Sequence, residues 1–438
     1  MDSVKLKRIR SVIERVKSRL RPDVDSLKNV DTVVDKINNS IKTLGIDAEC
    51  VKGGSIAKNT FLKHDHDVDL FVKFSPEYPD MQLSEILYNI LRKTFPRQSI
   101  QRVHGSRDYF QFRLGGLDYE IIPVINIHIS NLHESRNITD FSPLHVEWTG
   151  KKIKERPELA DEIRVAKQFC KANNVYGAES YINGFSGHIM DILVIHYGSF
   201  LSLVEKFATI TDVSAKNPII IDTEKLLDNP LNQLNKSKIT PLIIIDPIQP
   251  NRNAAAALSR EKLLIFVDAC KKFIDSPSED FFRIKKFNIR EKILEMKKSL
   301  KNAKIIILKV STIDGSKDIV GTKVYKVYEY MMRQLELNEF KILDSAWNFD
   351  YLKKRAVILY AFERQKLSDF VEKKGPPLNA KIDVKKFLEK HENTKINGNR
   401  IYATVKRKYA VPEQLLKDLL IEKYISDKVK KIYVDKII

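Results

Sequence analysis

The segment from Gly53 to Phe74, GGSIAKNTFLKHDHDVDLFVKF, constrains the fold of this chain more than any other stretch. Its last eight residues, DVDLFVKF, predict an apolar β-strand. Side chains at positions i and i+2 of a strand point to the same face, about 6.6–7 Å apart along it, so Asp67 and Asp69 project together. Two carboxylates this close repel each other unless a cation lies between them. The segment therefore predicts a strand that begins with a metal site.

The residues around this strand indicate which chemistry the metal site serves. Mg²⁺ prefers oxygen ligands and keeps open positions for substrate phosphates, and two such ions about 3.5–4 Å apart suit an in-line phosphoryl displacement. The preceding GGSIAK supplies backbone N–H groups, the Ser55 hydroxyl and the Lys58 charge, which suit a triphosphate. A D-x-D pair alone is usually solvated or capping, but a Gly-Ser about a dozen residues earlier favours catalysis.

A third carboxylate is expected from a neighbouring strand. The run LDYEIIPV offers both Glu120 and Asp118, which share one strand face with Tyr119 on the other. The alternation alone does not choose between the two.

Composition restricts the partners and the compartment. The 438 residues suggest roughly three domains, and the formal net charge of +19 predicts a polyanionic partner, nucleic acid first and an anionic membrane surface second. Three distant cysteines without a CxxC pair argue against a disulfide framework or zinc site and predict a reducing, cytoplasmic location. No run of about 20 apolar residues exists to span a membrane, and the basic N-terminal segment predicts an amphipathic helix rather than a secretory signal.

The pattern of elements divides the chain into three parts. Residues 1–140 predict α/β structure, residues 141–275 a helical region, and residues 276–438 a lysine-rich mixture of strands and helices. Gly115 and Gly116 predict a hairpin turn between two strand-like runs. The apolar run 187–207 predicts one buried helix, and Ser259 is the expected N-cap of a later amphipathic helix. The segments 304–310 and 400–409 predict strands.

Five further motifs follow in order: SPLH, EIRVAKQFCKANNVYGAE, GFSGHIMDILVIHYGSF, IIIDPIQPNRNAAAALS and KKGPPL. With Gly-Ser and D-x-D they resemble the archaeal (class I) tRNA CCA-adding enzymes, which are tRNA nucleotidyltransferases of the polymerase β-like superfamily. The resemblance covers nearly the whole chain. It implies an α+β multidomain fold with an α/β catalytic head, a helical neck, and a mixed α/β C-terminal body and tail that grip the tRNA acceptor stem.

The resemblance also implies roles for individual residues. The metal ligands of the family match Asp67, Asp69 and Glu120, because YEIIPV aligns Glu120 rather than Asp118 with the third ligand. The usual third residue is aspartate, so this chain departs by one methylene. Asn183 stands where many relatives have a basic residue. The residues that contact the nucleotide match Ser55, Lys58, His145, Lys167, Tyr176 and Arg252.

These matches imply specific roles on the nucleotide. Ser55 and Lys58 meet the triphosphate, and Lys167 and Tyr176 hold phosphate and sugar. His145 contacts the nucleotide, and Arg252 helps read the incoming base together with tRNA backbone phosphates.

The implied activity is template-independent addition and repair of the 3′-terminal CCA of tRNA. CTP and ATP are the substrates, two Mg²⁺ ions the cofactors, and pyrophosphate the second product. Relatives suggest a homodimer. The basic run Lys406, Arg407 and Lys408 is expected to meet phosphate backbone. The alternatives are another nucleotidyltransferase, such as a poly(A) polymerase or an oligoadenylate synthetase, and a catalytically silent RNA-binding relative, which only the unusual Glu120 favours.

Overall fold

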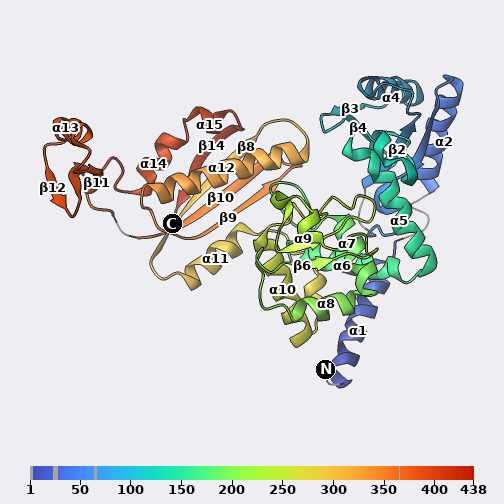
Figure 1. The fold of residues 1–438 in the computed structure, drawn as a ribbon, viewed down its shortest axis with the longest axis horizontal. Helices are drawn as coiled ribbons and strands as arrows, with labels where there is room; N and C mark the ends of the chain where they lie inside the picture. The colour runs from blue at the N-terminus through green and yellow to red at the C-terminus, as the bar shows by residue number, and fades with distance from the viewer. Residues whose placement is uncertain (1–2, 23–27, 64–66, 365) are drawn as a thin grey trace. The chain divides into compact units, whose positions relative to one another are not determined.

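The chain folds into two compact units, Met1–Lys285 and Lys286–Ile438 (Figure 1). The computed structural model describes residues 3–22, 28–63, 67–364 and 366–438. Both units combine sheets with helices, so the predicted α+β multidomain class is confirmed. The predicted division at residue 140 falls inside the first unit and stays a prediction.

A five-stranded sheet forms the α/β part of the first unit, in the order β1-β2-β5-β4-β3. Only β2 and β5 pair in parallel; the other neighbours are antiparallel. The elements are α2 (Lys28–Thr43), β1 (Ala48–Lys52), α3 (Gly54–Ala57), β2 (Asp67–Phe74), α4 (Asp80–Thr94), β3 (Gln101–Val103), β4 (Tyr109–Leu114) and β5 (Leu117–Ile125).

The alternation along β2 decides which face of the sheet carries the aspartates. Val68, Leu70 and Val72 are buried in one apolar core with residues of α2 and α4. Successive side chains of a strand point to opposite faces, so Asp67 and Asp69 lie on the face away from these helices. The predicted hairpin is also confirmed, because Gly115 and Gly116 join β4 to β5 with φ values of +60° and +84°, as a tight turn of this kind requires.

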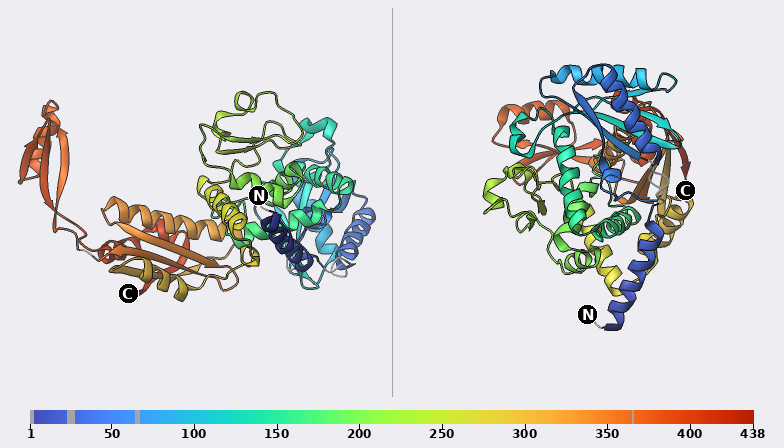
Figure 2. Two further views of the ribbon diagram at one scale, coloured as in Figure 1. Left: turned by 90° about the horizontal axis from the view of Figure 1, so that it is seen from below. Right: turned by 90° about the vertical axis from the view of Figure 1, so that its right-hand side faces the viewer.

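The rest of the first unit is mainly helical around a second apolar core. The predicted N-terminal helix is confirmed as α1, the dark blue helix at the N-terminus in Figure 2. Its apolar stripe is buried. Ser259 caps α10 by accepting a hydrogen bond from Lys262 N, as predicted. The elements are α1 (Ser3–Leu20), α5 (Ser142–Glu155), α6 (Leu159–Ala172), α7 (Gly187–Tyr197), α8 (Phe200–Ala208), β6 (Ile219–Ile221), α9 (Pro230–Gln233), β7 (Leu242–Ile244) and α10 (Arg260–Asp275).

The prediction of one helix over 187–207 is wrong, because the segment forms two helices with a 91° bend between them. Gly198 ends α7 with a left-handed φ of +81°, and the Ser199 side chain caps α8. Glycine adopts this conformation without a steric penalty. Within the described residues, no single helix is long and apolar enough to cross a membrane; only α7 and α8 counted together across the bend pass by length and composition, and both contribute to the buried core.

The second unit contains a four-stranded antiparallel sheet in the order β14-β8-β10-β9. Residues of α12 and α14 pack on one face, and Met296 of α11 packs on the other (Figure 1). The elements are α11 (Ile289–Ser299), β8 (Ala303–Thr312), α12 (Lys317–Leu337), β9 (Ile342–Asp350), β10 (Arg355–Glu363), α14 (Pro412–Leu419), α15 (Lys423–Ser426) and β14 (Val429–Ile437).

A smaller sheet, in the order β11-β13-β12, completes this unit. The strands predicted over 304–310 and 400–409 are confirmed as β8 and β13, although β13 ends at Lys406. The elements are β11 (Phe370–Pro377), α13 (Lys381–Lys390), β12 (Thr394–Asn397) and β13 (Arg400–Lys406).

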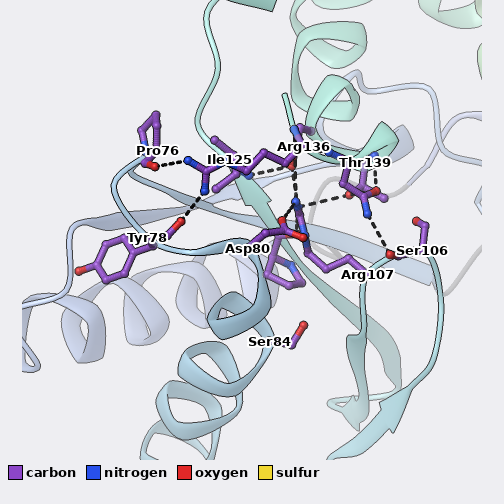
Figure 3. A network of polar contacts seen from close by, with 12 residues as sticks. Pro76, Tyr78, Asp80, Ser84, Ser106, Arg107, Ile125, Arg136 and Thr139 are labelled. Carbon is purple, nitrogen blue, oxygen red and sulfur yellow. Dashed lines mark hydrogen bonds and ion pairs between the residues drawn. The ribbon is translucent and has the colours of Figure 1, made fainter. Parts of the chain in front are cut away.

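A buried ion pair fixes the loop that leads into β4 (Figure 3). Arg107 donates to Asp140 Oδ1 at 2.6 Å, to the carbonyl oxygen of Pro123 at 3.0 Å and to Asp80. Asp140 also accepts hydrogen bonds from the backbone N–H groups of Ile125 and Arg136. The side chains of Arg107 and Asp140 are only 3% and 0% exposed. This network ties the loop between β3 and β4 to the end of β5. Both β4 and β5 carry residues of the candidate site described below.

We predict that Asp140→Ala lowers the free energy of unfolding of the first unit by about 3–5 kcal/mol, because it leaves the buried Arg107 charge without its main partner. Trp148 fluorescence during urea unfolding, in a Trp347→Phe background, reports on this unit alone. The control is Glu85→Gln, which breaks the exposed pair with Arg102 and should cost about 0–1 kcal/mol. Equal losses in both variants would contradict the structural role of the network.

Candidate active site

The Gly-Ser turn lies directly against the aspartate strand. Gly53 N donates to the carbonyl oxygen of Asp69 at 2.8 Å. A Cβ atom on Gly54 would lie 1.8 Å from Asp69 Oδ2, and φ at Gly54 is +51°. No other residue type fits there without displacing the carboxylate. The turn continues into the short helix α3, which holds Ser55, and Ser55 O accepts from Thr60 N at 2.8 Å.

Parallel pairing of β2 with β5 brings the predicted carboxylates together. Asp69 is the direct partner of Glu120, and Asp67 is the partner of Asp118. Neighbouring strands lie about 4.7–4.9 Å apart, so all four acidic residues share one face of the sheet. Asp118 also lies 3.7 Å from Arg113 in an exposed ion pair. The structure therefore places Asp67, Asp69 and Glu120 on one face of the sheet together with Asp118.

The charges of these carboxylates strongly affect one another. Burial and the charges of Asp69 and Asp67 raise the pKa of Glu120 to about 7, although a hydrogen bond from Gln111 acts in the opposite direction. Gln111 Nε2 donates to Glu120 Oε1 at 2.5 Å from the adjacent strand β4. Burial, and then Asp67, also raise the pKa of Asp69, which Lys58 and Lys167 act to lower. Such a site favours a bound cation.

Two buried lysines share one buried carboxylate beside this site. Lys58 Nζ lies 2.5 Å from Asp191 Oδ2, and Lys167 Nζ lies 3.6 Å from Asp191 Oδ1. Lys167 also donates to Thr60 Oγ1 at 2.9 Å. Burial alone would raise the pKa of Asp191, but both lysine charges hold it below its ordinary value. One carboxylate balances only one of the two ammonium groups, so the pair keeps a net positive charge that suits a phosphate.

The hydroxyl group of Tyr176 lies beside Gly187, the first residue of α7, and close to the lysine pair. A Cβ atom on Gly187 would meet the Tyr176 hydroxyl at 3.0 Å and Lys167 Cε at 3.8 Å. Tyr176 also forms a backbone bridge with Phe185. Asn183 adopts a left-handed φ of +53°, and its side-chain amide donates to Ser180 O at 2.7 Å. Tyr176 and Lys167 therefore both lie beside Gly187, whereas the side chain of Asn183 bonds within its own turn.

His145 and Arg252 both contact the buried carboxylate of Asp246. His145 Nε2 lies 2.9 Å from Asp246 Oδ1, and Arg252 Nη1 donates to Asp246 Oδ2 at 2.9 Å. His188 Nε2 lies 3.5 Å from the same Oδ2, and its ring centroid is 4.2 Å from that of His145. Burial lowers the pKa of His145. Burial would raise the pKa of Asp246, but the two histidines hold it well below its ordinary value.

Two groups of metal-ligating side chains are candidates, and among the described residues only one of them, His145, His188 and Asp246, has its ligand atoms close enough together to share an ion. Asp67, Asp69 and Glu120 offer only oxygen ligands, which hard divalent cations such as Mg²⁺ prefer. The ligand atoms of His145, His188 and Asp246 lie within 4.8 Å of one another, and imidazole ligands suit transition metals. In the second group Arg252 already occupies one carboxylate oxygen, so the carboxylate site is the better candidate for a catalytic cation.

Four residues that complete the site were missed by the sequence analysis. Asp191 and Asp246 form ion pairs with predicted cationic residues, the His188 ring lies 4.2 Å from that of His145, and Gln111 bonds Glu120. Asp191 and Asp246 lie inside motifs that were recognised, but the partners of Asp191 are 24 and 133 positions away. No periodicity predicts contacts at such separations.

Three family models match consecutive parts of the chain. The nucleotidyltransferase domain matches residues 34–139, the second domain of tRNA nucleotidyltransferase matches 161–283, and the C-terminal domain of CCA-adding enzyme matches 301–434. The first two ranges include the carboxylates, the lysine pair and Arg252.

Two curated relatives and one solved structure are similar to this chain. The chain is 30% identical to the CCA-adding enzyme of Thermococcus gammatolerans over 90% of this chain and 85% of that protein. It is 31% identical to the CCA-adding enzyme of Nanoarchaeum equitans over 82% of this chain and 84% of that protein. A solved cytoplasmic RNA terminal U-transferase shares the fold, with a TM-score of 0.51 and 12% identity over 64% of this chain and 100% of that one. The chain therefore belongs to the archaeal CCA-adding enzymes, a family of tRNA nucleotidyltransferases.

Proposed function

We propose that the site described above adds cytidine, cytidine and adenosine, in that order, to the 3′ end of tRNA and repairs incomplete ends. The RNA 3′-oxygen forms a bond to the α-phosphorus of CTP or ATP, the bond from that phosphorus to the bridging oxygen breaks, and pyrophosphate leaves. The observation that carries this proposal is the register of β2 and β5, which sets Asp69 opposite Glu120 beside a buried lysine pair.

The lysine pair and the turn are assigned to the triphosphate. Lys58 and Lys167 share Asp191 and retain a net positive charge next to Asp69, which suits the β- and γ-phosphates. Ser55 follows the glycine that contacts Asp69, so its hydroxyl is assigned to the same phosphates. Tyr176 is assigned to the sugar because its hydroxyl lies near Lys167 and the start of α7.

Asp67, Asp69 and Glu120 are assigned as ligands of two Mg²⁺ ions. The fit rests on the donor set, because neighbouring carboxylate charges help to raise the pKa values of Asp69 and Glu120 and all three residues offer only oxygen ligands. When bound, such ions would activate the RNA 3′-hydroxyl and neutralise charge on the pyrophosphate. The extra methylene of Glu120 is accommodated by Gln111, whose amide fixes one carboxylate oxygen.

The second unit is assigned to the tRNA acceptor stem. Lys373 and Lys374 on β11 and Lys406 on β13 are exposed on its small sheet, and the chain carries a net charge of +19. Arg407 is less available than the sequence suggested, because it pairs with Glu339 at 2.6 Å and is only 13% exposed. An A-form stem is recognised through backbone and shape, so one surface can serve every tRNA.

The compartment and assembly complete the proposal. Cys50, Cys170 and Cys270 are free and buried, which is compatible with the cytoplasm, where tRNA is processed. The resemblance also implies a homodimer, which light scattering of the purified chain would test.

A tRNA transcript that lacks its CCA end should receive two cytidines with Mg²⁺ and CTP alone, and one further adenosine when ATP is added. Sequencing of the 3′ end measures this. Long adenosine tails would indicate a poly(A) polymerase-like enzyme instead, and tight tRNA binding without incorporation would indicate a silent relative. Because phosphate contacts release counterions, tRNA binding should also weaken steeply with salt.

We expect Asp69→Asn to reduce incorporation by at least about 10³-fold, because it removes a ligand shared by both ions. Filter binding should show that tRNA affinity changes by less than about threefold. The matched control is Asp118→Asn, on the same sheet face but in an exposed pair with Arg113, and it should keep nearly full activity. Loss in the control but not in Asp69→Asn would refute the ligand assignment.

Glu120 should make the metal-free protein less stable as the pH rises. Its folded pKa of about 7 lies above the ordinary 4.5, so the folded state retains a proton that the unfolded state releases. The stability of the first unit should therefore fall by up to about 3 kcal/mol between pH 4.5 and 7. The Glu120→Gln variant should lose less stability between pH 4.5 and 7. At pH 8 in the presence of a chelator it should be more stable than the parent protein.

Urea unfolding followed by Trp148 fluorescence, again in a Trp347→Phe background, measures this difference. Adding Mg²⁺ at pH 8 should stabilise the parent protein and have little effect on Glu120→Gln. Identical pH profiles for the two proteins would show that Glu120 does not titrate in this way, and equal Mg²⁺ stabilisation would remove Glu120 from the ligand set.

A further inference from the structure

The Asp246 carboxylate is the centre of a polar cluster that joins three separate segments of the first unit. It follows β7 and is completely buried. Its Oδ1 accepts from His145 Nε2 at 2.9 Å and from the backbone N–H groups of Ile248 at 3.0 Å and Gln249 at 3.2 Å. Its Oδ2 accepts from Arg252 and lies 3.5 Å from His188 Nε2. Both oxygens are therefore in use at once.

Arg252 depends on this carboxylate for its orientation. Its side chain is 37% exposed and would otherwise sample many rotamers, at an entropic cost when it binds a ligand. The charge-assisted bond from Nη1 to Asp246 holds one edge of the guanidinium in place. Within the described part of the chain, Nη2 and Nε of Arg252 make no further hydrogen bond, so they remain for a substrate.

The fixed guanidinium also borders an open space. Arg252 lines a cavity of 580 Å³ together with Gln249, Pro250, Ile248 and Phe141. The Oε1 atom of Gln249, which lines this cavity, is buried without a hydrogen-bond partner among the described residues. The cavity therefore offers an unused acceptor beside a cation held by Asp246, which suits the edge of a nucleobase.

We propose that Asp246 is a positioning residue for base selection, holding Arg252 with one oxygen and His145 with the other, and that His188 completes this array. The inference rests on the proposed function, in which Arg252 and His145 contact the incoming nucleotide. Asp246 acts through them and does not itself touch the base. The carboxylate is required because it alone offers acceptors to all these donors at once.

Asp246→Asn tests this role. The amide has the same shape but replaces one acceptor oxygen with an N–H donor, which faces either Arg252 or His145. We expect the ratio of kcat/KM for CTP over ATP on a tRNA ending before its CCA to fall by about tenfold or more, the factor for one hydrogen bond to a charged group. The control is Asp222→Asn, a carboxylate that follows the neighbouring strand β6 and bonds only Leu227 N among the contacts described. It should keep the parent ratio.

A double-mutant cycle separates positioning from a general structural effect. If Asp246 acts through Arg252, Asp246→Asn should reduce the CTP/ATP ratio little further in an Arg252→Ala background. Fully additive losses would overturn the proposal, and so would an unchanged ratio in Asp246→Asn. An unchanged ratio in Arg252→Ala alone would instead refute the proposed role of Arg252, which distinguishes the two failures.

Two further measurements cover the remaining outcomes. If melting shows that Asp246→Asn does not fold, Asp246→Glu keeps the charge while shifting it by one methylene, and it should lower the CTP/ATP ratio by a smaller factor; an unchanged ratio there would overturn the proposal. Elemental analysis of the full chain after dialysis against Zn²⁺ tests the other use of these ligands. Stoichiometric zinc that is lost in His188→Ala would replace the positioning role with a metal centre.

Discussion

A single buried carboxylate, that of Asp191, allows this enzyme to keep two lysines inside its active site. A buried ammonium group without a partner costs several kcal/mol, and Lys58 and Lys167 are only 9% and 4% exposed. Lys58 follows the glycine turn, and Lys167 lies on α6. The carboxylate that contacts both comes from α7, so it joins the turn before the aspartate strand to the helical region.

Helix α7 also contacts the groups that are assigned to the nucleobase. Asp191 lies three residues after His188, and residues at this spacing are neighbours on a helix surface. His188 reaches the cluster around Asp246, where Arg252 and His145 meet. One helix of eleven residues thus sets the distance between the groups assigned to the triphosphate and the groups assigned to the base. Gly198 ends this helix with a left-handed φ of +81°.

The sequence was informative wherever a property depends on short-range pattern. The strand with Asp67 and Asp69, the glycine hairpin and the buried stripe of α1 all follow from alternation, turn chemistry or helical spacing. The prediction of a single helix over 187–207 was wrong because it relied on apolar composition and did not consider that Gly198 ends the helix. The choice of Glu120 over Asp118 needed the family resemblance, and the contacts of Asp191, Asp246 and Gln111 needed the tertiary structure, since each joins distant segments.

The position of Asp191 has a consequence for the order in which the enzyme can be made. Residues of the α/β sheet are synthesised well before α7, so Lys58 has no carboxylate partner until position 191 has left the ribosome. Until then its ammonium group is more stable in water than in its final buried place. The turn that carries Lys58 therefore reaches its final form only when the helical region folds against it. A complete triphosphate site therefore requires α7 to be in place.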